Sequence, residues 1–277
     1  MYKITKIINN NFVCSVNEKG EEVILRGLGI GFGKKSNDVA EESKIEKIYS
    51  MSSQSMLNKL QSLVDNIPLE HIKVCTEIID EIKLKLNKKL NENIYITLTD
   101  HLSFAIDRQR LKLEYKNALL WDIKKFYQIE YQMGLHALDM IKEKLGVTLM
   151  EDEAGFIALH IVNAELDTNI SDMMNITALI TDILELTRNY YKIDFDEDSL
   201  HFERFITHLK YFGQRLFQNK TVKDDDFQLQ KMIKTSYSKD YQCAEIINSY
   251  IKEKFNRELT GEEMMFLTIH LKRITMN

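Results

Sequence analysis

Hydrophobic and polar residues alternate over the first 35 residues of the chain and recur at helical spacing beyond residue 68. The short alternating runs are Tyr2–Ile8, Phe12–Val16 and Glu22–Leu25. Alternation predicts strands, and the Asn- and Gly-rich segments between the runs predict turns. Residues 27–35 follow with glycine at every second position as far as Gly33. We expect a further strand there, in which the missing side chains let another backbone or a ligand approach.

Helices are predicted for most of the remaining chain. Residues 36–66 are polar with thinly spaced apolar positions, which indicates a linker that becomes helix, and Pro68 suits the first turn of the next helix. Thr260 with Glu263 three residues later is a capping-box pattern. Helical periodicity predicts helices near 68–90, 97–112, 122–145, 150–166, 171–191, 198–218, 227–256 and 260–275.

The helical part contains one segment twice. Residues 131–160 return as 241–270 at a constant offset of 110 positions, so that Glu153 and His160 correspond to Glu263 and His270. Upstream, His101 with Arg108 resembles His208 with Arg215 at an offset of 107 positions. A repeat of this length indicates a domain duplication rather than a solenoid. The expected fold is a small all-β head followed by two all-α helical bundles, with domains at 1–56, 68–169 and 170–277 and a linker at 57–67.

Composition restricts the class of protein. A chain of 277 residues with 44% hydrophobic and 29% charged residues is typical of a soluble multidomain protein. It contains neither a run of eighteen apolar residues nor a signal peptide, so we expect a cytoplasmic protein without membrane insertion. Cys14, Cys75 and Cys243 are scattered, which favours reduced thiols over structural zinc. Residues 1–35 hold six basic and three acidic residues in a chain of net charge −5, which favours a polyanionic partner for the head.

Four of the seven histidines, His101, His160, His208 and His270, lie at repeated positions. One interpretation makes them buried core residues, each satisfied by a nearby acceptor. A second is a metal site, but the chain has no His-x-x-x-His motif and no Cys/His cluster.

The third interpretation, reversible phosphorylation, explains the arginines that accompany these histidines. A neutral imidazole is a good nucleophile near neutral pH, and its phosphorylated product carries nearly two negative charges that an arginine can bind. Arg108 and Arg215 lie two helical turns after His101 and His208, and Arg273 lies one turn after His270. No Walker loop, Ser-His-Asp order or Rossmann fingerprint is present, so neither an enzyme nor a cofactor is expected.

Several longer motifs give the chain an end-to-end resemblance to a known family. They are Ile7–Asn11, Thr97–His101, Asn117–Trp121, Asp152–His160, Thr207–Lys210 and Leu267–His270. In these the chain resembles the transcriptional antiterminators of bacterial β-glucoside operons (the BglG/LicT type). The resemblance implies a β-sheet head that binds an RNA hairpin as a homodimer and keeps an overlapping terminator from forming. It also implies two helical regulation domains of the sugar phosphotransferase system.

The same resemblance assigns partners and roles to the two regulation domains. A sugar-transporting enzyme II is expected to inhibit through the first domain, at His101 and His160. The phosphocarrier HPr is expected to activate through the second domain, at His208 and His270. A DNA-binding activator with the same regulation domains is the alternative, but it needs a helix-turn-helix head, and residues 1–35 show strand patterns.

The RNA-binding residues implied by the resemblance are Lys6, Asn11, Gly27, Gly29 and Phe32. An asparagine can hydrogen-bond to RNA, and a phenylalanine can stack on an unpaired base. Phe32 is equally compatible with a packed strand residue. Leu28 stands where the family usually has arginine, and Gly33 where it has glutamine. Arg26 lies two positions from Leu28, so in a continuous strand it shares that face and can substitute for the missing arginine.

Overall fold

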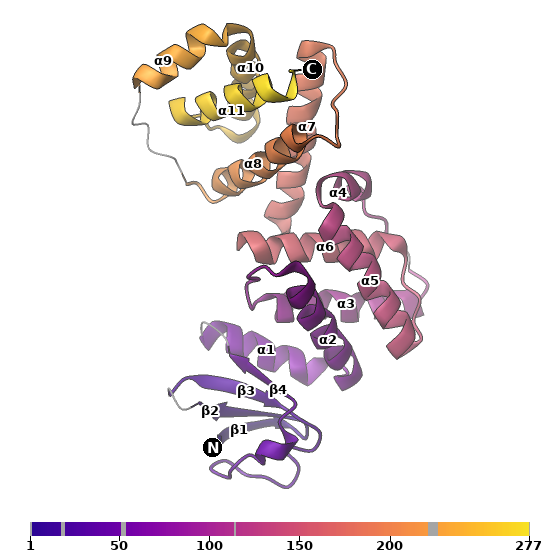
Figure 1. The fold of residues 1–277 in the computed structure, drawn as a ribbon. Helices are drawn as coiled ribbons and strands as arrows, with labels where there is room; N and C mark the ends of the chain where they lie inside the picture. The colour runs from indigo at the N-terminus through magenta and orange to yellow at the C-terminus, as the bar shows by residue number, and fades with distance from the viewer. Residues whose placement is uncertain (1, 18–19, 51–53, 114, 221–226, 277) are drawn as a thin grey trace. The chain divides into compact units, whose positions relative to one another are not determined.

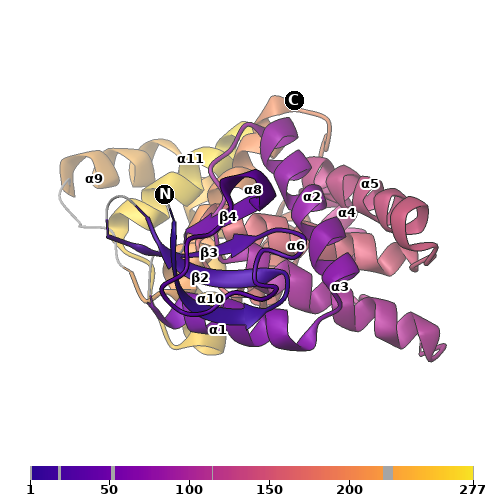
Figure 2. The same cartoon turned by 90° about the horizontal axis from the view of Figure 1, so that it is seen from below.

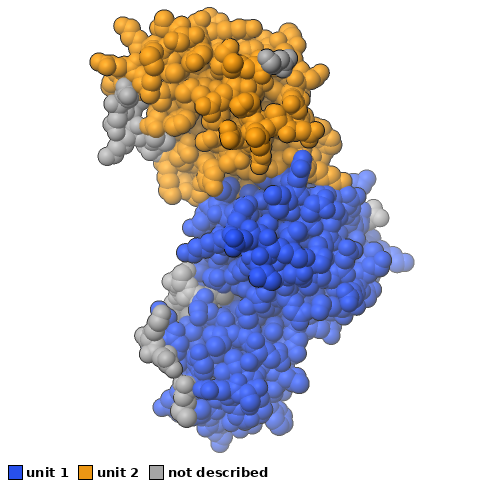
Figure 3. All heavy atoms as spheres, in the orientation of Figure 1, with its two compact units in different colours: residues 1–120, 127–167 blue, residues 121–126, 168–277 orange. Residues whose placement is uncertain are grey.

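The expected order of a β-sheet head followed by helical domains is confirmed by the architecture of the chain (Figure 1). A computed structural model describes residues 2–17, 20–50, 54–113, 115–220 and 227–276. The chain divides into two compact units, which Figure 3 distinguishes by colour. Unit 1 consists of residues 1–120 and 127–167, and unit 2 consists of residues 121–126 and 168–277.

The head is one antiparallel sheet whose four strands lie in chain order. The strands are β1 (Lys3–Asn9), β2 (Phe12–Val16), β3 (Glu22–Arg26) and β4 (Lys47–Ser50). The Asn9 side-chain oxygen accepts hydrogen bonds from the backbone N–H groups of Asn11 and Phe12, at 2.9 and 3.1 Å. The Asn9 side chain thus satisfies the backbone N–H groups of the turn between β1 and β2, and this explains why the first strand ends at the asparagine run. The head is thus a sheet, and not the helix-turn-helix that the DNA-binding alternative needs.

The glycine-rich segment was wrongly predicted as a strand. Residues 28–33 form consecutive turns, and the fourth strand, β4, lies instead within the segment 36–66 predicted as a linker. Gly29 and Gly33 have φ angles of +66° and +68°, a left-handed conformation that glycine adopts without strain. A Cβ atom on Gly27 would lie 1.7 Å from the carbonyl oxygen of Lys44, so glycine is needed there for the close approach of a second backbone segment.

The two faces of the sheet pack against different partners. One face forms a small cluster of Ile4, Val13, Val23, Leu25, Ile30 and Ala40. On the other face Phe12, Cys14, Ile24 and Tyr49 belong to the same hydrophobic cluster as α1 (Gln54–Asn66) and α2 (Leu69–Leu86). Figure 2 shows α1 beside the strands. Gln61 of α1 donates a hydrogen bond to the Cys14 Sγ at 3.0 Å, so most of the predicted linker 57–67 is a packed helix.

The remaining helices of unit 1 include those that carry His101 and His160. They are α3 (Ile94–Arg110), α5 (Gln128–Leu145) and α6 (Glu151–Leu166). Unit 2 holds α4 (Leu120–Phe126), α7 (Ile170–Tyr191), α8 (Leu200–Phe217), α9 (Phe227–Ser236), α10 (Ser238–Phe255) and α11 (Gly261–Ile274). The predicted capping box of Thr260 and Glu263 is confirmed at the start of α11.

Two predicted helices, 122–145 and 227–256, are each broken into two at equivalent tyrosines. Tyr127 separates α4 from α5 and Tyr237 separates α9 from α10, with ψ angles of 47° and 48°. Neither glycine nor proline marks these breaks, so hydrophobic periodicity did not reveal them. The first break has a structural reason, because α4 belongs to unit 2 and α5 to unit 1.

Candidate functional site: two pairs of facing histidines

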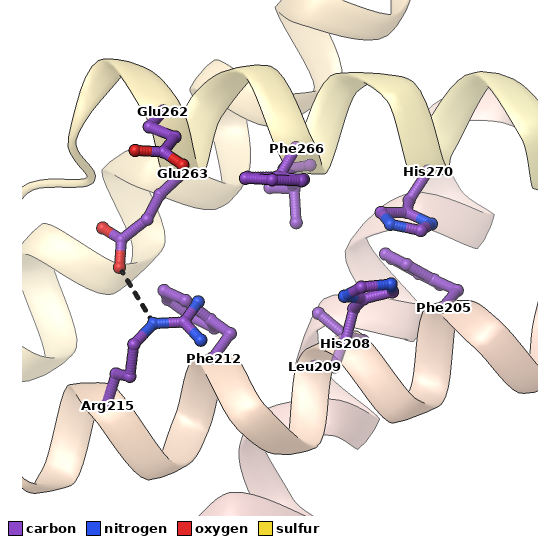
Figure 4. Close-up of a pocket in the computed structure, with 10 residues that line it drawn as sticks. Phe205, His208, Leu209, Phe212, Arg215, Glu262, Glu263, Phe266 and His270 are labelled. Carbon is purple, nitrogen blue, oxygen red and sulfur yellow. Dashed lines mark ion pairs between the residues drawn. The ribbon is translucent and has the colours of Figure 1, made fainter. Parts of the chain in front are cut away.

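Unit 2 brings His208 of α8 and His270 of α11 together, with their ring centroids 4.2 Å apart (Figure 4). His270 lies on the buried stripe of α11 with Leu267 and Leu271, and its ring stacks on the buried Phe205 at 6.2 Å. His208 is exposed on α8. The pair therefore presents one ring to solvent and holds the other in the core.

The two rings line a cavity of about 280 Å³ that extends along α8 and α11 to Arg215 and Glu263. The Nε of Arg215 is 3.9 Å from the Glu263 Oε1, too far for a hydrogen bond, and it is buried without a hydrogen-bond partner. A partly exposed guanidinium with a buried, unused Nε–H donor is suited to bind an anion. The lining residues are Phe205, His208, Leu209, Phe212, Arg215, Glu262, Glu263, Phe266, Leu267 and His270.

Both rings of this pair are neutral at pH 7. Burial, followed by the charge of His208 and then that of Arg273, lowers the pKa of His270 from 6.5 to about 4. Burial, followed by the charges of Arg215 and Arg273, also lowers the pKa of His208. A neutral imidazole keeps a nitrogen lone pair available, so the surroundings that disfavour the proton leave the ring able to attack phosphorus.

Unit 1 forms the corresponding pair from His101 of α3 and His160 of α6, with ring centroids 5.0 Å apart. The Nε2 of His101 lies 2.9 Å from the Glu153 Oε2, and Arg108 donates to the Glu153 Oε1 at 2.5 Å. Burial, and then the charge of His101, lowers the pKa of His160 to about 3. The Nδ1 of His160 is buried without a hydrogen-bond partner. The first pair is therefore tied to a carboxylate that is itself bound to the arginine.

Aromatic side chains enclose this first site. The Arg108 guanidinium lies 4.9 Å from the ring centroid of Phe104 and 5.1 Å from that of Tyr115. Tyr115 in turn contacts Phe156 at 5.7 Å, and Phe156 contacts the His101 ring at 5.5 Å. Phe104 and Tyr115 are more than half exposed, at 60% and 57%, so their contacts serve to orient Arg108 rather than to bury it fully.

The structure thus brings the four predicted histidines into two pairs, with Arg108 and Arg215 in the matching sites. Arg273 is exposed on α11 and acts on the second pair through its charge. The other three histidines do not join the pairs: His71 contacts Ser103, His136 contacts Glu81 and His201 is exposed. The part of the chain that the structure describes contains no group of three or more His, Cys, Asp or Glu residues arranged to hold a metal ion.

The predicted RNA-binding residues of the head differ in exposure. The Asn11 side chain accepts a hydrogen bond from the Gly29 N–H at 3.0 Å, and the Asn11 carbonyl accepts one from the Gly27 N–H at 3.0 Å. Asn11 therefore fixes the glycine-rich loop against the β1–β2 turn. Phe32, on the same loop, is 73% exposed, and Lys6 of β1 donates to the Gln61 Oε1 at 3.2 Å.

Arg26 does not share a face with Leu28. Its side chain is only 8% exposed and forms an ion pair with Glu46, with the Arg26 Nε 3.6 Å from the carboxylate. Leu28 is 67% exposed in the first turn after β3. The expectation that Arg26 can replace the missing arginine depended on a continuous strand, and the chain turns away between the two residues.

Sequence reasoning missed two residues that shape these sites. Glu153 was identified as a repeated position but not as the partner of His101. Arg257 donates to the Glu263 Oε1 at 2.8 Å and was not identified at all. A position-by-position comparison of the two repeats shows Arg257 as a difference between them, because the corresponding residue of the first repeat is Val147.

The chain combines a β-sheet head with one helical module, carrying a histidine pair, that is present twice, and comparisons with known proteins identify the modules. Residues 2–58 match the CAT RNA binding domain, and residues 76–164 and 181–274 each match the PRD domain. The chain is 46% identical to the transcription antiterminator LicT of Bacillus subtilis (strain 168) over 272 residues, covering 98% of both chains. It is 42% identical to the beta-glucoside operon antiterminator of Dickeya chrysanthemi over 272 residues, covering 98% of this chain and 96% of that one.

A solved structure agrees with these relatives. The crystal structure of GlcT CAT-PRDI matches with a TM-score of 0.53 and 38% sequence identity, over 59% of this chain and 98% of that one. The chain therefore belongs to the family of transcription antiterminators built from a CAT RNA-binding domain and PRD domains. Within the residues described, no helix is both long and apolar enough to cross a membrane.

Proposed function

We propose that this chain is an RNA-binding antiterminator whose activity is set by phosphorylation of its two histidine pairs. Its head binds an RNA hairpin in nascent mRNA and so prevents formation of an overlapping terminator. The observation that carries the proposal is the pairing of His101 with His160 and of His208 with His270, each pair beside an arginine, in a chain that begins with a CAT domain. The names of the relatives, which are antiterminators, support the same function.

Phosphoryl transfer to the second site needs a phosphohistidine donor, and the acceptor and the cations are present in the site. The lone pair of a neutral His208 nitrogen attacks the phosphorus of a phosphohistidine on the phosphocarrier HPr. The N–P bond of the donor breaks, and its electron pair returns to the donor ring, which takes up the proton that the acceptor ring loses. Arg215 and Arg273 then lie beside a group that carries nearly two negative charges.

The two sites are proposed to act with opposite sign. The resemblance to the family assigns the activating role to phosphorylation at His208 and His270, where Arg215 and Arg273 lie near the new charge. Phosphorylation at His101 and His160, under control of a sugar-specific enzyme II, inhibits. The active form is a homodimer, in which a symmetric protein meets the two related halves of an RNA hairpin.

A terminator-reporter assay tests the switch. We expect His101→Ala to give antitermination without the inducing sugar and His208→Ala to be inactive with or without it. His201→Ala is the matched control, because His201 is an exposed histidine on α8 outside the pairs and its loss should leave the sugar response intact. If both site variants respond to sugar like the parent, phosphorylation of the histidine pairs does not control the protein.

Two measurements on the full chain test RNA binding and assembly. Affinity for a hairpin from the leader of a neighbouring sugar-transport operon should fall as salt rises, with a slope set by a few phosphate contacts. Light scattering should show a dimer under the conditions in which RNA binds. A monomer that binds the hairpin with undiminished affinity would contradict the dimer.

A further inference from the structure

The two histidine sites differ in the position of one equivalent glutamate. Glu153 of α6 and Glu263 of α11 occupy the same place in the repeat. The Glu153 carboxylate bridges His101 and Arg108. The Glu263 carboxylate instead accepts hydrogen bonds from Arg257 at 2.8 Å and from the Thr260 N–H at 3.1 Å. Figure 4 shows it turned toward Arg215 and away from the two rings.

The residues before each helix explain this difference. Arg257 and Thr260 correspond to Val147 and Met150 at the offset of 110 positions. Valine cannot donate a hydrogen bond to the glutamate, and Met150 makes no side-chain cap at the start of α6, whereas Thr260 forms the reciprocal capping box with Glu263. The preceding residues in both repeats, Gly146 and Asn256, adopt the same left-handed conformation, so the local backbone is alike.

We propose that Glu153 is a gate that occupies the phosphoryl-binding position of the first site, and that Arg257 and Thr260 hold the equivalent gate open in the second. This inference rests on the proposed function, because it concerns which site accepts a phosphoryl group readily. The second site is ready for phosphorylation, and the first accepts a phosphoryl group only after Glu153 has moved.

Charge and geometry explain why Glu153 opposes transfer. A phosphoryl group transferred to the Nε2 of His101 would lie beside the Glu153 carboxylate, which is hydrogen-bonded to this nitrogen at 2.9 Å. The same carboxylate holds Arg108, which is the cation that the phosphoryl group needs. Two like-charged groups would then compete for one guanidinium, and the contacts of Arg108 with the Phe104 and Tyr115 rings restrict its movement. A donor protein that displaces Glu153 as it docks would gain selective access to the first site.

Labelling with phosphoramidate, a small phosphoryl donor that needs no protein partner, tests the gate on the full chain. The rate of phosphorylation at each histidine is followed by mass spectrometry of the peptides that contain His101 and His208, kept at alkaline pH. In the parent we expect His208 to be labelled faster than His101. Glu153→Gln should raise the His101 rate by roughly tenfold, the scale of one charged hydrogen bond, and leave His208 unchanged.

Asp107→Asn is the matched control, because it removes the same charge from an exposed site on α3. Its labelling rates should equal those of the parent. If Glu153→Gln leaves the His101 rate unchanged, the gate is refuted. If Glu153→Gln lowers that rate, Glu153 instead orients the His101 ring for attack, and the gate is equally refuted.

Exchange of the residues before the two helices provides a second test that leaves both glutamates in place. Val147→Arg with Met150→Thr should raise the His101 rate, and Arg257→Val with Thr260→Met should lower the His208 rate, each by several-fold. Circular dichroism verifies that the variants are folded. Unchanged rates in both folded exchange variants would overturn the inference.

The outcome is separable from that of the proposed function. Failure of phosphorylated HPr to label the parent, while phosphoramidate labelling follows the gate, would refute the proposed HPr control and support the gate. If phosphorylated HPr labels the parent, but phosphoramidate labels His101 at equal rates in the parent and in Glu153→Gln, the proposed HPr control is supported and the gate is refuted.

Discussion

Replacing Arg215 by glutamine removes the cation that faces the open phosphoryl site and keeps a side chain of similar length. In the unphosphorylated protein the Arg215 Nε lies 3.9 Å from the Glu263 Oε1 without a hydrogen bond. Unit charges about 4 Å apart attract by ~4 kcal/mol at an effective dielectric constant of about 20, and a doubly charged phosphoryl group at that distance by about twice as much. A phosphoryl group on His208 that comes within this distance of Arg215 therefore attracts the guanidinium more strongly than Glu263 does.

The measurable loss is smaller than these Coulomb terms, because water solvates the partly exposed guanidinium and the phosphoryl group. Charged hydrogen bonds contribute about 1.5–3 kcal/mol in mutational studies, which corresponds to roughly ten- to a hundredfold in an equilibrium constant. We expect Arg215→Gln to shift the phosphoryl-transfer equilibrium between HPr and His208 by this factor toward phosphorylated HPr. The difference in this equilibrium between the parent and the variant should be smallest at high salt, where the charges are screened.

The assay mixes phosphorylated HPr with the full chain and measures both phosphoproteins at equilibrium by phosphorus NMR. Arg188→Gln is the matched control, because Arg188 also has a buried Nε without a hydrogen-bond partner but lies on α7, where it forms an ion pair with Asp194. The control should keep the parent equilibrium. An Arg215→Gln equilibrium equal to that of the parent would refute the assignment of Arg215 as the phosphoryl-binding cation.

Three further predictions concern RNA affinity and stability. Leu28→Arg should tighten RNA binding by roughly 1–3 kcal/mol in a gel-shift titration, and an unchanged affinity would mean that this exposed position does not face RNA. Gly27→Ala should lower the free energy of unfolding by about 1–3 kcal/mol or more in a urea titration, because its Cβ would overlap the Lys44 carbonyl; full parental stability would contradict this. Unfolded His270 takes up a proton near its ordinary pKa of 6.5, whereas the folded ring does so only near 4, so stability should fall by on the order of 3 kcal/mol as the pH drops through this window. In His270→Asn the free energy of unfolding should fall less steeply with decreasing pH. Identical pH dependence in the parent and the variant would refute the assignment of this effect to His270.

Sequence reasoning succeeded where a local pattern determines the structure. Helical periodicity located most helix ends to within a few residues, since the apolar stripe that faces the core must recur at the helical period. The constant offset between the two repeats predicted equivalent histidines, and the structure pairs them as His101 with His160 and His208 with His270. The capping box needed only Thr260 and Glu263, because its geometry is local.

Features that depend on tertiary contacts were not predictable in the same way. Alternate glycines fit a strand and a chain of turns equally well. Contacts with other segments, such as the packing of Gly27 under Lys44 and the hydrogen bond from Gly29 to Asn11, select the turns. Residues 47–50 are a strand because they pair with β3, since their own pattern is too short to indicate one. The different positions of Glu153 and Glu263 follow from neighbouring side chains that no periodicity encodes. The domain boundaries at 56, 67 and 169 stay predictions.

The core shared by the sheet and the helices of unit 1 has a consequence for genetics. Phe12 and Ile24 of the head lie in one hydrophobic cluster with Leu60 of α1 and Ile78 of α2, all of them at most 2% exposed. Elements that share a core tend to unfold cooperatively. Ile78→Ala should therefore lower the free energy of unfolding by about 2–5 kcal/mol and destabilise both α2 and the sheet of the head. A screen for loss of RNA binding should therefore recover substitutions in α1 and α2. At lower temperatures, where these variants stay folded, they should still respond to sugar.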